Sequence, residues 1–225
     1  MPTQRLISKL PPKAAAILKH ALIPKLNRYT NLPIALDLLK RKQITLLSPD
    51  TWEDRNDAFY LERYREELRF RCVLAVCFST TSETFHHWRI FSHGASGICI
   101  EFDKAKLLSS LQAQKEIRHQ AVEYHPLFTL QRNKPDIEQW PFIKRHAFKA
   151  ESEYRIVYES KKESLRAMSL NIDLTSIRMI TLSPWLAEHT AASVIDIIKS
   201  IDGCSGIKVN RSSLIDNAGW RDIIK

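Results

Sequence analysis

The sequence has few of the residues from which phosphate-binding loops and disulfide frameworks are built. It contains only five glycines, and none of them falls in a GxGxxG or GxxxxGK[ST] pattern, so we predict neither a dinucleotide-binding Rossmann domain nor a P-loop. Its four cysteines include no CxxC pair, which indicates no disulfide framework and favours a reducing, cytoplasmic compartment. The HExxH, PCxxC and GxSxG motifs are also absent, and we predict no metal site.

Long apolar runs are lacking as well. Lys9, Lys13 and Lys19 interrupt the apolar residues of Met1–Leu22, so this stretch does not have the core of a signal peptide. No other run approaches the length of a membrane-spanning helix. We therefore expect a protein without a membrane partner.

Basic residues are in excess. Lysine and arginine number 34 against 25 acidic residues, which gives a net charge of +9. Such an excess attracts polyanions, so nucleic acid is the first partner to consider; the alternative is a surface that is merely basic. Two clusters are candidate contacts: Arg63, Arg65, Arg69 and Arg71 in one, and Lys144, Arg145 and Lys149 in the other. For the first cluster, a solvated helix surface is the preferred interpretation.

Short helices alternate irregularly with short strands, without repeats or a flexible linker. This pattern predicts one α+β domain over residues 26–225 and a helical extension over residues 1–25. The expected helices cover residues 11–22, 33–42, 58–70, 83–92, 103–115 and 190–201. The expected strands cover residues 26–29, 44–47, 71–80, 98–102, 117–124, 150–159, 171–174, 178–182 and 207–209.

The strand expected over Ala150–Glu159 carries the most unusual pattern. Alternation would place Glu151, Glu153 and Arg155 on one face, opposite a face of aromatic and branched residues. Two carboxylates beside a guanidinium either form a cross-strand ion ladder or line a cleft.

Three short motifs lie on or beside three of the expected strands. Arg28 lies in an early strand, Ser79-Thr80-Thr81-Ser82 ends the most apolar strand, and Glu151-x-Glu153 precedes a late strand. At these residues the chain resembles the ADP-ribosyltransferase superfamily, in the clade with an arginine, a Ser-Thr-Ser and a Glu-x-Glu motif. The serine motif departs by one residue, so any of its hydroxyls could fill the serine role.

Over about residues 26–213 the chain also resembles an uncharacterised bacterial family close to abortive-infection proteins. The residues that carry this resemblance are Arg28-Tyr29, Asn56-Asp57, Cys77-Phe78-Ser79, Trp88, Gly97–Phe102 and Glu151-x-Glu153-Tyr154-Arg155.

The transferase resemblance implies mixed sheets with flanking helices and NAD as a substrate. Glu153 would stabilise the positive charge that develops on the ribose, Glu151 would act on the incoming nucleophile, and Arg28 would grip the diphosphate. Ser79 would hold Arg28 and Glu153 in place. The predicted NAD-binding set is completed by Tyr29, Thr30, Thr80, Phe85 and Trp88, of which the aromatic residues would stack on a ring. Each of these residues also has an ordinary structural interpretation, as an ion pair, a cap or core.

We therefore expect an NAD-dependent ADP-ribosyltransferase that acts in the cytoplasm as a toxin or phage-defence effector. Its acceptor would be nucleic acid, with RNA favoured, or a protein, and an antitoxin could neutralise it. A first alternative is an NAD-independent ribonuclease that uses His86, His87 or His146 with Arg89. A second is a binding module without catalytic activity.

Overall fold

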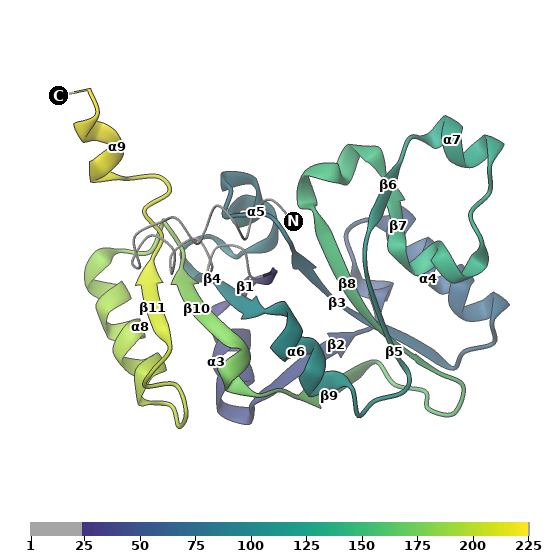
Figure 1. Cartoon of the computed structure of the whole chain (residues 1–225), viewed down its shortest axis with the longest axis horizontal. Helices are drawn as coiled ribbons and strands as arrows, with labels where there is room; N and C mark the ends of the chain where they lie inside the picture. Colours follow the sequence, from purple (N-terminus) through teal and green to yellow (C-terminus); the bar gives the residue numbers. More distant parts are fainter. Residues whose placement is uncertain (1–23, 225) are drawn as a thin grey trace, which may run out of the picture.

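A nine-stranded mixed sheet runs through residues 24–224, the part of the chain that the computed structural model describes (Figure 1). The strand order is β11-β10-β4-β1-β3-β2-β9, and β8 also pairs with β3 while β5 pairs with β8. These strands are β1 (Lys25–Asn31), β2 (Gln43–Leu47), β3 (Cys72–Ser79), β4 (Gly97–Asp103), β5 (Ile117–Ala121), β8 (Glu153–Ser160), β9 (Ala167–Asn171), β10 (Ile177–Leu182) and β11 (Lys208–Arg211). A small second sheet pairs β6 (Glu123–His125) with β7 (Ile143–Arg145).

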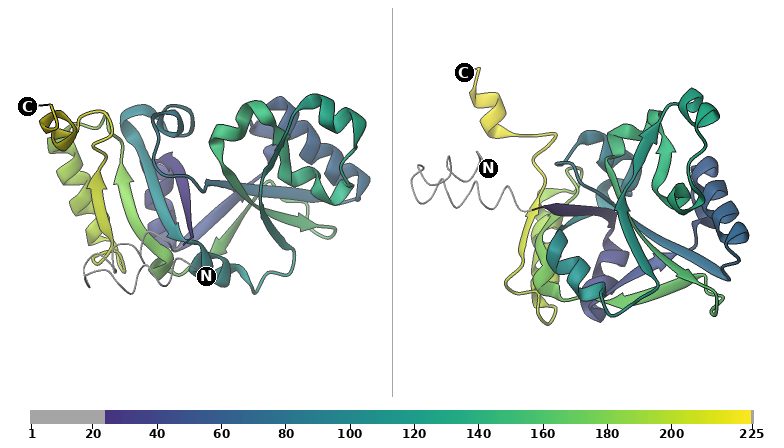
Figure 2. Two further views of the ribbon diagram at one scale, coloured as in Figure 1. Left: turned by 45° about the horizontal axis from the view of Figure 1, so that its top comes forward. Right: turned by 45° about the vertical axis from the view of Figure 1, so that its right-hand side comes forward.

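Helices cover the sheet in both halves of the molecule (Figures 1 and 2). They are α3 (Leu32–Arg41), α4 (Arg55–Glu67), α5 (Phe85–Phe91), α6 (Lys104–Leu111), α7 (Leu127–Arg132), α8 (Glu188–Ser200) and α9 (Ala218–Asp222). Short 3-10 turns connect them at η1 (Pro49–Thr51), η2 (Gly94–Ser96), η3 (Ile137–Phe142), η4 (His146–Glu151) and η5 (Leu174–Ser176). The prediction of an α+β architecture with flanking helices is confirmed within the described residues.

Most predicted elements are present, with shifted ends. Helix α4 begins at Arg55 rather than Ala58, because Asp54 caps it by accepting hydrogen bonds from the N–H groups of Asn56 and Asp57. The strand expected over residues 171–174 is wrong: β9 ends at Asn171, and Asp173 caps the 3-10 turn that follows. The helix predicted over residues 11–22, with most of the proposed extension, lies outside the described residues.

The two faces of β3 and β8 contribute to different hydrophobic clusters. Tyr154, Ile156 and Tyr158 of β8 belong to the large core. Val157, from the other face of the same strand, packs with Leu61 of α4 in a smaller cluster. Glu153 and Arg155 share this second face, as strand alternation predicts. Both side chains are buried beneath the α4 side of the sheet.

Strand β3 pairs continuously with one neighbouring strand but only at single positions with two others. Along its whole length it pairs with β8, whereas β1 and β2 each meet it at one position, Asn27 opposite Ser79 and Leu47 opposite Ala75. Between these two positions neither β1 nor β2 pairs with β3, so the sheet is open beside Cys77. No helix within residues 24–224 is long and apolar enough to cross a lipid bilayer.

Candidate active site

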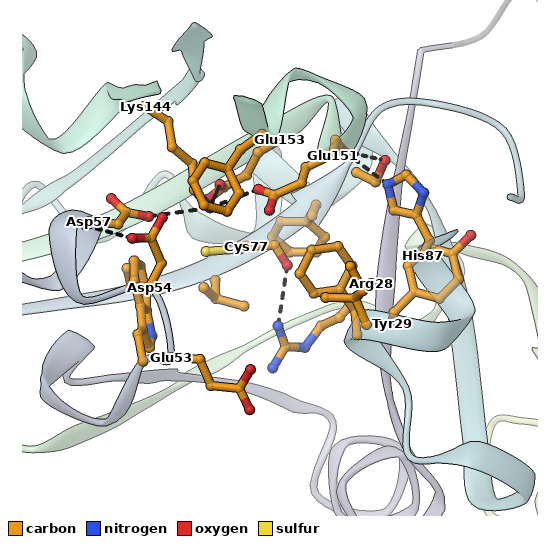
Figure 3. A pocket seen from close by; sticks show the side chains of 18 of the residues that line it. Arg28, Tyr29, Glu53, Asp54, Asp57, Cys77, His87, Lys144, Glu151 and Glu153 are labelled. Atoms are coloured by element: carbon orange, nitrogen blue, oxygen red, sulfur yellow. Dashed lines mark hydrogen bonds and ion pairs between the residues drawn. The ribbon is translucent and has the colours of Figure 1, made fainter. Parts of the chain in front are cut away.

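A cavity of about 390 Å³ lies over this opening in the sheet (Figure 3). Its walls come from β1, β2, β3, α5, the segment that enters α4, and the segment from Lys144 to Glu153. Four of the residues predicted to act in the site line it together: Arg28, Ser79, Glu151 and Glu153. The fold thus brings together motifs that are more than 120 residues apart in the sequence.

Arg28 fills the gap between β1 and β2. Its guanidinium donates a hydrogen bond of 3.3 Å to the main-chain carbonyl of Cys77, on the edge of β3 where neither neighbouring strand pairs. A carbonyl left without a partner at this position would be costly, so Arg28 completes the sheet edge. Burial lowers the pKa of Arg28. The bond to Cys77 uses one of the five N–H donors of the guanidinium.

Glu151 and Glu153 are brought together by a turn before β8, and not by alternation along one strand as predicted. Glu151 ends the turn η4, Ser152 has a left-handed backbone with φ of 47°, and β8 begins only at Glu153. The prediction that strand alternation places both carboxylates on one face is therefore wrong for Glu151. The two carboxylates nevertheless converge on one ammonium group, since Lys144 Nζ lies 2.7 Å from Glu151 Oε2 and 3.5 Å from Glu153 Oε2.

The left-handed turn at Ser152 is held from three sides. Ser79 donates its hydroxyl to the carbonyl of Glu151 at 2.9 Å, and Thr80 donates its hydroxyl to the carbonyl of Ser152 at 2.9 Å. His87 Nε2 lies 3.0 Å from the same Glu151 carbonyl, which requires a proton on this nitrogen. Such support offsets the strain of a non-glycine residue at positive φ.

Ser79 therefore does not act as predicted. The structure gives its hydroxyl no bond to the side chain of Arg28 or Glu153 within residues 24–224, and it orients the main chain of Glu151 instead. Thr80 is exposed, outside the cavity lining, and bound to Ser152. Both residues position the turn that carries the glutamates.

Behind the cavity, Glu153 is joined to a buried ion network. Arg155 is fully buried and donates from Nε to Glu153 Oε1 at 2.7 Å. Its two terminal nitrogens form a bidentate pair with Asp57 at 2.9 and 2.7 Å. Lys144 reaches the same Asp57 at 3.5 Å. The fork-to-carboxylate geometry fixes the Glu153 carboxylate from the protein side.

The two glutamates have opposite electrostatic environments. Burial opposes ionisation of Glu153, but Arg155 and then Lys144 outweigh it and hold the pKa of Glu153 at about 2. For Glu151, burial prevails over the attraction of Lys144, and its pKa is raised. Burial also opposes the charge of Lys144, yet Glu153, Asp57 and Glu151 raise its pKa. Glu153 is thus a fixed anion, whereas Glu151 accepts a proton more readily than Glu153 does.

The predicted aromatic and hydroxyl contacts divide into those at the cavity and those away from it. Tyr29 lines the cavity and stacks on His87, with ring centroids 5.3 Å apart. Thr30 is buried and outside the lining. Trp88 is 0% exposed and donates its indole N–H to Glu83, so it is core and not available for stacking on a ligand. Phe85 is 51% exposed and contacts Trp185 instead of the cavity.

The three histidines of the ribonuclease alternative do not lie together in one site. Only His87 lines the cavity; it is buried, its pKa is lowered by burial, and Thr84 and Glu151 engage its two ring nitrogens. His86 and His146 are exposed outside the lining. In the helix α4, Arg63 and Arg65 pair with neighbouring glutamates, which agrees with a solvated helix surface.

The sequence does not predict that Asp57 and Lys144 belong to the site. It indicates Asp57 only through the Asn56-Asp57 pair and Lys144 only as a candidate contact for nucleic acid. The one available signal is charge balance, because two carboxylates beside Arg155 on a packed strand need further counterions when buried. No cluster of three or more residues that could hold a metal ion occurs among the described residues.

A family model described as "Protein of unknown function (DUF2971)" matches residues 87–156. The matched segment contains Trp88, Gly97–Phe102 and the Glu151-x-Glu153 motif, but neither Arg28 nor Ser79. Comparison with curated proteins gives no match.

Among solved structures, the chain is similar to Thermus sp. 2.9 DarT. The structure in complex with NAD+ has 8% sequence identity and a TM-score of 0.44, covering 85% of this chain and 96% of that chain. The structure in complex with ADP-ribosylated ssDNA has 9% identity and a TM-score of 0.45, covering 84% of this chain and 94% of that chain. At these values the likeness is distant and assigns neither substrate nor activity to the present site.

Proposed function

We propose that this protein is an NAD-dependent ADP-ribosyltransferase. The observation that carries the proposal is the convergence of Arg28, Glu151 and Glu153 on one cavity, with Ser79 supporting the glutamate turn. These are the residues through which the sequence resembles the transferase superfamily. Three short motifs would not be expected to meet at one opening in a sheet by their order alone.

The cavity offers groups that suit the reacting half of NAD. Its volume of about 390 Å³ lies within the range of small-molecule sites, about 300–1,000 Å³. Arg28 has donors to spare for the diphosphate, and a planar guanidinium matches phosphate oxygens. Tyr29 contributes an aromatic surface on the same wall.

The proposed reaction breaks the bond between the ribose C1′ and the nicotinamide nitrogen. The bonding electron pair leaves with nicotinamide, whose ring becomes neutral, and positive charge develops at C1′. An ionised carboxylate beside the ribose stabilises this charge, as in glycoside hydrolysis. A nucleophile on the acceptor then bonds to C1′ and gives up its proton to a base.

The environments of the two glutamates support a division of these tasks. Glu153, whose pKa is held low by Arg155 and Lys144, stays ionised and suits the stabilisation of charge. Glu151, whose pKa is raised by burial, suits the acceptance of a proton from the nucleophile. Pairs of carboxylates with pKa values driven apart are a common basis for such assignments.

The acceptor we favour is nucleic acid, on account of the net charge of +9; a protein acceptor is the alternative. A role as a toxin or phage-defence effector follows from the family resemblance. It predicts that expression slows growth of the host and that Glu153→Ala relieves the effect.

The direct test uses NAD labelled on the adenylate. The protein is incubated with this NAD and with RNA, DNA or cell lysate, and both nicotinamide release and label transfer are measured. Glu153→Gln should lower both by about 100- to 1,000-fold, the loss typical when a charge-stabilising group is removed. Glu151→Gln should impair transfer more than hydrolysis.

Glu138→Gln is the matched control. Its carboxylate pairs with Arg118 at the surface, with a side chain 59% exposed, so both activities should stay near those of the unchanged protein. Transfer that survives Glu153→Gln would reject the assignment of the site. Equal losses of hydrolysis and transfer in Glu151→Gln would reject the division of labour.

A further inference from the structure

An aromatic and basic cluster lies at the surface on the far side of α5 from the cavity. Phe85 and Arg89, one helical turn apart, meet Trp185 from the loop after β10. The Arg89 guanidinium carbon lies 4.3 Å from the ring centroid of Trp185 and 5.2 Å from that of Phe85. We call these three residues the α5 platform.

The guanidinium of Arg89 makes cation–π contacts with aromatic rings in place of an ion pair with a carboxylate. Among residues 24–224 its side chain interacts with the rings of Phe85 and Trp185, and its guanidinium N–H groups donate no hydrogen bond. Arg63, by contrast, is neutralised by two glutamates. A stacked guanidinium with unused donors is suited to a phosphate, and its plane and the neighbouring rings are suited to bases.

Both sides of the platform are anchored. Arg211 donates to the carbonyls of Leu186 and Pro184 at 2.6 Å each, on either side of Trp185. On the helix side, Trp88 is fully buried and bonded to Glu83. The main chain that carries the rings is therefore fixed before any ligand arrives, which lowers the entropy cost of binding.

The neighbouring cavity needs such an external anchor if it serves a polyanion. Its lining contains five carboxylates, on Glu53, Asp54, Asp57, Glu151 and Glu153, but only two permanent cations, Arg28 and Lys144. Lys144 is already engaged by the glutamates, so Arg28 alone is left for the NAD diphosphate. A nucleic-acid backbone would be repelled from the cavity and must be bound outside it.

Helix α5 connects the two places. His87, Ile90 and Phe91 face the cavity from the side of the helix opposite Phe85 and Arg89. We propose that the α5 platform binds single-stranded nucleic acid, with bases stacked on Phe85, Arg89 and Trp185 and a phosphate on Arg89. That the bound strand presents its acceptor group to the cavity rests on the proposed function; the binding itself does not.

The test is fluorescence anisotropy of the full chain with labelled 12-nucleotide single strands of DNA and RNA and with duplex DNA, without NAD. Single strands should bind more tightly than duplex, because only unpaired bases can stack on the platform. Trp185→Ala should weaken single-strand binding by about 5- to 150-fold, the effect of losing one stacked base. Arg89→Ala should weaken it and also flatten the dependence on salt. The affinities for the DNA and the RNA single strands show which nucleic acid the platform prefers.

Arg63→Ala is the matched control, since it removes the same charge from a neutralised surface pair and should leave binding nearly unchanged. Trp185→Phe and Arg89→Lys guard against misfolding: the first should restore most of the affinity, while the second keeps the charge but loses the planar stack. Failure of the unchanged protein to bind any single strand would overturn the proposal. So would equal affinity in the platform variants and Arg63→Ala, which would leave the platform to a protein partner. Because no NAD is present, either result is separate from failure of the transferase proposal.

Discussion

The buried ion network behind Glu153 makes a quantitative prediction about stability. Replacing Arg155 by methionine preserves much of the side-chain volume but removes a guanidinium that is 0% exposed. It would leave the carboxylates of Glu153 and Asp57 buried, with Lys144 at 3.5 Å as their nearest remaining cation. Breaking a buried pair from one side typically costs about 3–5 kcal/mol.

The pKa of Glu153 gives a second route to the same magnitude. A decrease from the ordinary value of 4.5 to about 2 corresponds to about 3 kcal/mol, at 1.36 kcal/mol per unit. Because the folded pKa is depressed, this stabilisation is present above pH 4.5 and is lost as the pH falls towards 2. In Arg155→Met the pKa of Glu153 rises, so the difference in stability from the unchanged protein should narrow between pH 7 and pH 4.

Urea unfolding at several pH values measures this directly. At pH 7 we expect Arg155→Met to lose about 3–5 kcal/mol, or about 6–20 °C in Tm for a domain of this size. Arg63→Met is the control, because an exposed pair contributes at most about 1 kcal/mol. A loss in Arg155→Met no larger than that of Arg63→Met, or one independent of pH, would refute the reasoning.

Two further predictions concern residues on either side of the glutamates. Lys144→Met removes the cation 2.7 Å from Glu151 and should raise the already elevated pKa of that carboxyl. The acid limb of the pH profile of label transfer to the acceptor should then move to higher pH, and an unmoved limb would argue against Glu151 as the base. Trp88→Ala should lower the free energy of unfolding by about 3–5 kcal/mol, as expected for an emptied core position, and denaturant unfolding measures the loss. A loss below about 1 kcal/mol would contradict the core assignment of Trp88.

The resemblance to the transferase superfamily predicts that the three motifs share a site, and local patterns predict the strand or turn on which each motif lies. Arg28, Ser79 and Glu153 lie on β1, β3 and β8, and their placement required only local patterns of strand and turn. Asn31 caps α3 and Asp103 caps α6, and such caps can be found from the sequence because capping depends on residues within one turn. The most apolar strand, β3, pairs with β8, β1 and β2, as expected for a strand that is apolar on both faces.

Sequence patterns do not predict interactions between residues that are far apart in the chain, either electrostatic or by packing. The left-handed turn at Ser152 exists because Ser79, Thr80 and His87 satisfy its carbonyls, and nothing near Ser152 in the sequence signals this. Phe85 and Trp88 share one short helix, yet one is exposed and the other fully buried. The spacing of aromatic residues identifies a helix face, but the surrounding fold decides what that face meets.

The arrangement around Glu153 reconciles burial with chemistry. Arg155 holds one oxygen from the interior at 2.7 Å, whereas the other oxygen faces Lys144 at 3.5 Å, on the cavity side. Lys144 is 10% exposed, and its ammonium pairs with the oxygen of Glu153 that would face the positive charge developing at the ribose in the proposed reaction. The ion pair with Arg155 can therefore keep Glu153 ionised and oriented. Meanwhile the outward oxygen of Glu153 can turn from the Lys144 ammonium to the charged ribose. A carboxylate bound by a guanidinium through both oxygens would have fewer lone pairs free for a substrate.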